Sequence, residues 1–270
     1  MAIIEALVLG IVQGLTEFLP ISSSAHLVLV PELLGWEQPS LPYVVLLHAG
    51  TLLALIIYFR RELAALATGV FRRGPERRLA ALLVLGTLPA AAIGFVFEKQ
   101  FEEAFGEPVQ VALQLVVSGL ILVAAEALYR RNDKRENRRS NDEGAEQMSR
   151  SLSWRSALGV GFAQAFAIVP GISRSGATIA AGLLAGLSRA TAARFSFLLS
   201  IPILFGTSVF EVPKLSGSHP GMAALVVGFV ASAVSGYAAI AGLIAFLQRR
   251  GLLPFAAYCV VVGALAASAL

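Results

Sequence analysis

Two polar stretches interrupt an otherwise apolar chain and decide how it folds. Residues 13–26 read QGLTEFLPISSSAH, and residues 170–178 read PGISRSGAT. Each stretch has a proline that ends one helix and hydroxyl side chains that can begin the next. A broken backbone is tolerated at membrane depth only where protein covers it or it lines a wet cavity. We therefore interpret both stretches as buried turns of helical hairpins that have a function.

The composition around these turns predicts an all-α polytopic membrane protein. Of the 270 residues, 57% are hydrophobic and 14% are charged, whereas about a quarter of the residues of a soluble domain are charged. Six uncharged apolar runs are near the length that a bilayer requires, at residues 41–59, 79–97, 108–125, 195–210, 221–247 and 251–270. Two further apolar stretches, 2–30 and 157–187, contain the polar turns. The first is too long and too polar in its middle for a cleavable signal peptide.

The basic residues predict the orientation, because cytoplasmic loops are enriched in Lys and Arg. Three connections hold most of them: Arg60, Arg61, Arg72, Arg73, Arg77 and Arg78; Arg130, Arg131, Lys134, Arg135, Arg138, Arg139, Arg150 and Arg155; Arg249 and Arg250. Six alternating spans fit this distribution only if each broken stretch enters and leaves on one side. We thus expect two re-entrant hairpins, and topology explains the pI of 9.6 without a nucleic-acid partner.

The two halves of the chain resemble each other after a shift of 151 residues, the separation between Gly10 and Gly161. The shift also places Gln13 on Gln164 and the serines 22–24 on residues 173–175. We predict a single membrane domain, 1–270, made of repeat one (1–128), a cytoplasmic linker (129–155) and repeat two (156–270). Three spans in each repeat give the repeats opposite orientations, which places a functional site near the midplane. The alternative is a chance match in an apolar chain.

The first turn carries candidate catalytic residues. Gln13 and Glu17 are four residues apart, on one face of the incoming helix. The hydroxyls that begin the next helix form an anion site together with its free N–H groups, and they belong to Ser22, Ser23 and Ser24. His26 follows Ser23 by three residues, a spacing that lets a base reach a hydroxyl nucleophile.

The second turn adds an arginine to the same arrangement. Arg174 is the side chain best matched to phosphate oxygens, and the hydroxyls around it are those of Ser173, Ser175 and Thr178. Under the shift of 151 residues, Arg174 is the counterpart of Ser23. This correspondence favours Ser23 over its two neighbours as the nucleophile that faces the phosphate-binding arginine.

Each of these residues also has a structural interpretation. Gln13 and Gln164 can be interhelical hydrogen-bond partners, and clustered hydroxyls can satisfy freed backbone groups. Glu17 and Arg174 can form a purely structural pair, although ionisable residues in a bilayer usually mark function. We interpret His48 as a hydrogen-bonded packing residue and Cys259 as structural, and we assign His219 no role.

The metal evidence rests on one carboxylate. Glu17 is the only acidic side chain in either turn, and no His and Cys cluster suits zinc. Mg²⁺ is commonly held by one carboxylate together with substrate phosphates. We therefore expect a divalent cation, Mg²⁺ or Ca²⁺, that binds with the substrate at Glu17.

The motifs QGLTEFLPISS and PGISRSGAT resemble the two signature motifs of the undecaprenyl-diphosphate phosphatase, or bacitracin-resistance, family. The resemblance covers essentially the whole chain. It implies a hydrolase in the bacterial plasma membrane that removes the terminal phosphate of undecaprenyl diphosphate and recycles the lipid carrier of peptidoglycan synthesis. It also implies an active site that opens to the exterior.

The resemblance assigns roles to individual residues. It implies Ser23 as nucleophile, His26 as the motif histidine and Arg174 as the phosphate clamp. The acidic positions of the first motif fall on Gln13 and Glu17. Many members carry Glu where this chain has Gln13, so a cation held between two carboxylates is not implied here.

Two other functions fit parts of the sequence. Inverted repeats with broken helices are also typical of transporters, including a flippase of a polyprenyl phosphate, but a carrier does not need a serine beside a histidine. The lipid phosphatases related to vanadium haloperoxidases carry a Ser-Arg pair followed by His and Asp, which do not follow Ser188 and Arg189 at that spacing. The sequence leaves open whether the protein forms a homodimer.

We predict that both termini face the exterior and that the 129–155 linker faces the cytoplasm. Single cysteines introduced into a Cys259→Ser background test this orientation. Exterior cysteines should react with a membrane-impermeant thiol reagent in intact cells, and a linker cysteine should react only after lysis. Labelling of the linker in intact cells would contradict the predicted topology.

Overall fold

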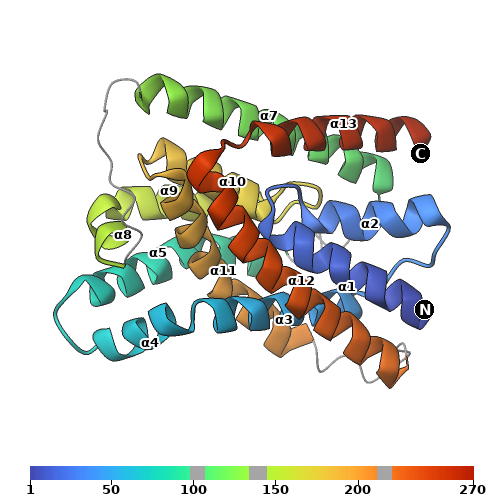
Figure 1. Ribbon diagram of the computed structural model, residues 1–270, viewed down its shortest axis with the longest axis horizontal. Coiled ribbons are helices and arrows are strands. Elements are labelled where there is room, and N and C mark those ends of the chain that lie inside the picture. The colour runs from blue at the N-terminus through green and yellow to red at the C-terminus, as the bar shows by residue number, and fades with distance from the viewer. Residues whose placement is uncertain (98–106, 134–144, 212–220) are drawn as a thin grey trace.

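The computed structural model describes residues 1–97, 107–133, 145–211 and 221–270, and in these ranges the regular structure is helical (Figure 1). The helices are α1 (Ile3–Phe18), α2 (Ser23–Leu34), α3 (Leu41–Tyr58), α4 (Arg60–Gly69), α5 (Pro75–Val96), α7 (Pro108–Asp133), α8 (Ala145–Ser151), α9 (Trp154–Phe166), α10 (Arg174–Leu184), α11 (Arg189–Glu211), α12 (Met222–Arg249) and α13 (Leu253–Ala269). The all-α polytopic class predicted from the sequence is confirmed.

In the part of the chain that the structure describes, five helices are long and apolar enough to cross a membrane: α3, α5, α7, α11 and α12. The sixth predicted span, 251–270, corresponds to α13, which has 17 residues. At 1.5 Å per residue α13 is about 26 Å long, close to the thickness of the hydrocarbon core. Several helices extend beyond the predicted apolar runs because charged residues continue their ends, as in α7 and α11.

The two interrupted stretches form helical hairpins, as expected. The first is α1 and α2, and the second is α9 and α10. In Figure 1 the arms of α1 and α2 lie at the end of the molecule that holds both chain termini, and α8 and the connection between α4 and α5 lie at the opposite end. The orientation predicted from the sequence puts exterior connections at residues 98–107 and 211–220. Residues 98–106 and 212–220, which include His219, lie outside the described residues.

Close helix packing depends on glycines that let backbones approach. Helix α1 packs along α12, where a Cβ at Gly10 would lie 2.5 Å from the Gly228 carbonyl oxygen. Helix α9 packs along α5, where Gly161 faces the backbone of Gly86. A shift of 151 residues carries α1 onto α9 and places α5 on α12. Each hairpin therefore packs on the second span of the other half of the chain.

Helices α7 and α13 pack against each other along one edge of the molecule (Figure 1). A Cβ at Gly119 of α7 would meet Ala256 and Val260 of α13, and a Cβ at Gly263 of α13 would meet Ala112 and Val116 of α7. The small residue of each helix thus faces the same kind of surface on the other. These glycines let the two helix backbones approach closely.

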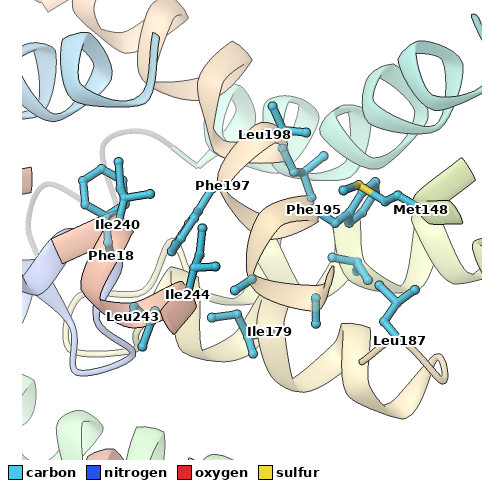
Figure 2. Packing of buried hydrophobic residues seen from close by; sticks show 14 of the residues in the cluster. Phe18, Met148, Ile179, Leu187, Phe195, Phe197, Leu198, Ile240, Leu243 and Ile244 are labelled. Carbon is cyan, nitrogen blue, oxygen red and sulfur yellow. The ribbon is translucent and has the colours of Figure 1, made fainter. Parts of the chain in front are cut away.

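The main hydrophobic core reaches the first hairpin through Phe18, which is 1% exposed. The Phe18 ring meets the Phe197 ring of α11 edge to face, with centroids 5.3 Å apart, and Figure 2 shows both rings beside Ile240 and Ile244. Edge-to-face packing is a favoured geometry for aromatic pairs. Because Phe18 follows Glu17 directly, this contact anchors the last turn of α1, which carries Glu17.

A buried carboxylate, that of Glu126, joins three segments near the C-terminal end of α7. Glu126 is completely buried, and it accepts hydrogen bonds from the Arg189 Nη2 at 2.6 Å, the Arg130 Nε at 2.7 Å and the Leu252 N–H at 3.2 Å. A Cβ at Gly251 would collide with the Glu126 carboxylate. No sequence pattern indicated this cluster, which ties α7 to the starts of α11 and α13.

The predicted 129–155 linker is not a solvated loop throughout. Helix α7 continues to Asp133, and α8 packs against α5. Met148 and Leu152 belong to the main hydrophobic core with exposures of 2% and 0%. The mixed charges of this segment concealed two apolar side chains that bury it against the bundle, and residues 134–144 lie outside the described ranges.

We predict opposite effects of alanine at two helical glycines. A Cβ at Gly14 would lie 2.5 Å from the Ser232 carbonyl oxygen and 2.7 Å from the Gly236 N, whereas a Cβ at Gly159 would meet nothing within 4 Å. Gly14→Ala should lower stability by about 1–3 kcal/mol through overpacking. Gly159→Ala should leave it unchanged or raise it by up to about 1 kcal/mol, because Ala favours helix. Thermal unfolding in detergent measures both, and equal effects would contradict the close packing of α1 on α12.

Candidate active site

The first turn lies between α1 and α2, where the backbone leaves the helical path at Leu19 (ψ 139°) and Pro20 follows. Ser22 is the N-cap of α2, and its Oγ accepts the Ala25 N–H at 3.3 Å. Ser22 has φ 68°, and it is the only non-glycine with positive φ among the described residues. The cap and this backbone bend direct the N-terminus of α2 into the protein.

The second turn follows Pro170, and its geometry requires glycine. Gly171 has φ 93°, and a Cβ there would lie 2.5 Å from the Val111 carbonyl oxygen. Ser118 of α7 fastens this turn, because its hydroxyl donates to the Gly171 carbonyl at 3.2 Å and accepts the Ser173 N–H at 2.9 Å. Ser173 caps α10 by accepting the Gly176 N–H at 3.0 Å.

The two turns contact each other, although they lie some 150 residues apart in the sequence. The Gly171 N–H donates to the Ser24 Oγ at 3.1 Å, with a sequence separation of 147 residues. The Ser175 hydroxyl donates to the Leu19 carbonyl at 3.1 Å. The N-termini of α2 and α10 therefore open toward one shared region, as the repeat predicted.

Glu17 is the centre of this region. Its carboxylate accepts hydrogen bonds from the Ser23 hydroxyl at 2.6 Å and from the Gln13 Nε2 at 3.0 Å, both on Oε2. Arg174 donates from Nη2 to Oε1 and forms an ion pair with it. The His48 Nε2 lies 3.4 Å from Oε2. The structure thus brings Gln13, Glu17, Ser23 and Arg174 together around one carboxylate.

The burial of this pair constrains the site strongly. The Glu17 side chain is 3% exposed and the Arg174 side chain is 22% exposed. A charge this deep is expensive without an opposite charge and hydrogen bonds, and removing one partner leaves the other uncompensated. The more exposed edge of the guanidinium keeps further N–H donors for a ligand.

His26 lies elsewhere than expected. Its Nδ1 hydrogen-bonds to the Ser22 carbonyl at 2.7 Å and its Nε2 to the Tyr258 hydroxyl at 2.8 Å. Both ring nitrogens of His26 are engaged, and in the described contacts the Ser23 hydroxyl donates its hydrogen bond to Glu17 instead. The three-residue spacing put His26 one turn from Ser23 but did not reveal that the α2 backbone and α13 hold the ring.

His48 contributes more than packing. The Val44 carbonyl can only accept, so the His48 Nδ1, 2.8 Å away, must donate to it. The remaining nitrogen, Nε2, therefore faces Glu17. An ionisable residue alone in an apolar span was the signal for this role, but the sequence did not indicate that His48 faces the first turn.

The other predicted site residues mainly fasten the turns. The Ser22 and Ser24 hydroxyls lie 3.1 Å apart, and those of Ser173 and Ser175 lie 3.2 Å apart. Thr178 donates to the Arg174 carbonyl at 2.7 Å and contacts the Ser196 hydroxyl. These contacts agree with the backbone role considered above, and substrate binding by these residues stays a prediction.

The two glutamines do not act as a matched pair. Gln13 donates within its own helix, to Glu17. Gln164 is 1% exposed, and neither atom of its amide has a hydrogen-bond partner among the described residues. The structure therefore gives no interhelical hydrogen bond for either of them.

Comparison with known proteins shows the family of this chain. Residues 6–265 match the family model described as "Bacitracin resistance protein BacA". The chain belongs to this family. An undecaprenyl-diphosphatase of Geobacter sulfurreducens is 44% identical over 273 residues, which cover 97% of this chain and 96% of that protein. An undecaprenyl-diphosphatase of Geotalea daltonii is 42% identical over 277 residues, which cover 98% and 97%, and one of Rubrobacter xylanophilus is 42% identical over 281 residues, which cover 99% and 98%.

The oxygen atoms beside Glu17 fit a hard divalent cation. Because the Glu17 carboxylate can only accept, Gln13 must turn its Nε2 toward it, and the Gln13 Oε1 is then buried without a hydrogen-bond partner in the described chain. Carboxylate, amide and hydroxyl oxygens are ligands that Mg²⁺ and Ca²⁺ accept. The described residues contain no cluster of three or more His, Cys, Asp or Glu side chains suited to a metal. A cation here would therefore take most of its ligands from substrate and water.

We predict that Arg174→Lys lowers kcat/KM for a prenyl diphosphate by about a hundredfold. Lysine keeps the charge but cannot hold Glu17 and a phosphate with one planar group, and misplacement of a reacting group is costly. Arg130→Lys is the matched control, since Arg130 is 55% exposed and pairs with Glu126 outside the site. Near-normal turnover of Arg174→Lys would show that Arg174 acts as a point charge or a structural partner.

Proposed function

We propose that this protein hydrolyses undecaprenyl diphosphate to undecaprenyl phosphate and inorganic phosphate, and so recycles the lipid carrier of peptidoglycan synthesis. One observation carries the proposal: the Glu17 carboxylate accepts the Ser23 hydroxyl on one oxygen and Arg174 on the other. A hydroxyl, an adjacent base and a guanidinium are the groups that phosphoryl transfer needs. The undecaprenyl-diphosphatase names of relatives that are 39–44% identical support the substrate.

Ser23 is the nucleophile in this mechanism. Its hydroxyl is 2.6 Å from the Glu17 Oε2, so the proton can move to that oxygen as the Ser23 Oγ attacks the terminal phosphorus. The Oγ–P bond forms while the bond from phosphorus to the bridging oxygen breaks, and undecaprenyl phosphate leaves. Water then attacks the phosphoserine: its oxygen bonds to phosphorus as the P–Oγ bond breaks, and Glu17 returns its proton to the Ser23 Oγ. Inorganic phosphate leaves, and one proton of the water is released to solvent.

Arg174 and the helix N-termini bind the phosphates. Nη2 of Arg174 holds Glu17, and the remaining N–H groups are available to equatorial phosphate oxygens, where charge accumulates in the transition state. The first-turn N–H groups of α2 and α10 add positive electrostatic potential at the same place. The prenyl tail needs no polar recognition and can lie among apolar helix surfaces in contact with lipid.

Glu17 and Gln13 would hold a divalent cation, Mg²⁺ or Ca²⁺, that arrives with the diphosphate. When bound, such an ion neutralises phosphate charge and helps to orient the reacting group. In our proposal the site opens to the exterior of the bacterial plasma membrane, as the family resemblance implies.

Phosphate release by the purified protein in detergent tests this function, with farnesyl or undecaprenyl diphosphate as substrate. We expect release that a chelator abolishes and that Mg²⁺ or Ca²⁺ restores. Ser23→Ala should lower kcat by at least about a hundredfold, whereas Ser24→Ala, which removes a hydrogen bond between the turns, should cost less than about tenfold. Glu17→Gln should lose activity even at saturating cation.

Several outcomes would contradict parts of the proposal. No phosphate release from the wild type, with transport of a prenyl phosphate across vesicles, would favour the flippase. Full activity of Ser23→Ala with loss in Ser22→Ala or Ser24→Ala would move the nucleophile. Full activity of Glu17→Gln would show that Glu17 is neither the base nor a ligand of the cation.

A further inference from the structure

Helix α13 holds the first turn from outside the hairpin. The Tyr258 hydroxyl lies 2.8 Å from the His26 Nε2, and the two rings stack with centroids 5.7 Å apart and planes 14° from parallel. The next residue, Cys259, contacts the Pro20 carbonyl oxygen through its Sγ at 3.6 Å. Two consecutive residues of α13 therefore contact the chain on either side of Ser22 and Ser23, at Pro20 before them and at His26 after them.

His26 links Tyr258 to the backbone of Ser22 through hydrogen bonds of its two ring nitrogens. The Ser22 carbonyl can only accept, so the His26 Nδ1 donates to it at 2.7 Å. The Nε2 of a neutral ring is then an acceptor, and Tyr258 donates to it. Both ring nitrogens are used, and the contacts run from Tyr258 through His26 to Ser22.

Ser22 is the residue that needs support. Its φ of 68° is unfavourable for a side chain larger than glycine, and such conformations persist only where the surroundings hold them. Its counterpart in the second half, Ser173, has φ −72° and no such strain. The strained conformation directly precedes Ser23, so a change at Ser22 redirects the Ser23 hydroxyl.

We propose that Tyr258 is a positioning residue for the phosphatase reaction: through His26 it holds the strained Ser22 backbone, and so keeps the Ser23 hydroxyl aimed at Glu17. This inference rests on the proposed function. Tyr258 lies on α13, 235 residues after Ser23 (258 minus 23), and contacts neither Ser23 nor Glu17 by any hydrogen bond that the structure shows.

Tyr258→Phe tests the role, because it keeps the ring and removes only the hydroxyl. We expect kcat for phosphate release to fall about tenfold, the effect of one lost hydrogen bond, with KM within about twofold and an unchanged unfolding temperature. Tyr237→Phe is the matched control. Both tyrosines are 41% exposed, but Tyr237 packs on the ring of Tyr58 instead of on a turn residue. It should retain full activity.

His26→Asn separates positioning from a general structural effect. The Asn amide can donate to the Ser22 carbonyl in place of Nδ1 but is too short to reach Tyr258. His26→Asn should therefore keep measurable activity, and adding Tyr258→Phe to it should cost nothing further. A double-mutant cycle on kcat measures this coupling.

Three results would overturn the inference while the wild type still releases phosphate. Tyr258→Phe could equal Tyr237→Phe in kcat. The losses in kcat caused by His26→Asn and by Tyr258→Phe could multiply in the double variant, to about a hundredfold, which would make the two residues independent. His26→Asn could be as inactive as His26→Ala, which would assign His26 a proton-transfer role. An inactive wild type would instead contradict the proposed function.

Discussion

The ion pair between Glu17 and Arg174 is the constraint on which the rest of the structure depends. Each charge comes from a different hairpin, and either charge alone, buried without its partner, would destabilise the fold. The pair therefore requires both turns to meet, and the contacts of Ser24 with Gly171 and of Ser175 with Leu19 bring them together. The glycine contacts of α1 with α12 and of α9 with α5 hold each hairpin closely against a span of the other half of the chain.

The sequence was sufficient for what depends on local chemistry. Proline followed by hydroxyl residues marks a helix break wherever it occurs, so both turns and the residues in them could be predicted. The sequence could not show toward which neighbour a single side chain in a long apolar helix points. His48 and Tyr258 reach the first turn from α3 and α13, and Met148 enters the core from a charged segment. In each case a tertiary contact, and no local pattern, decides the role.

The three serines of the first turn show how similar residues acquire different roles. Ser22 caps α2 and carries the strained backbone, and Ser24 binds the opposite turn. The hydroxyls of Ser22 and Ser24 thus make hydrogen bonds that hold the turns in place. Ser23, the first residue of α2, directs its hydroxyl at Glu17. Ser23 is also the counterpart of Arg174 in the repeat, and these two residues share one carboxylate.

The charge of the site sets a condition on its ligand. Glu17 and Arg174 nearly cancel, so a diphosphate that enters brings uncompensated negative charge into a region where solvent screens it poorly. Two helix N-termini offset only part of this charge, since each supplies about half an elementary charge. The buried, unpartnered Gln13 Oε1 is the one oxygen near Glu17 that is ready for a cation among the residues the structure describes. In our proposal, a cation that enters with the diphosphate would balance this excess negative charge, whereas a cation resident without substrate would face Arg174 across the same carboxylate.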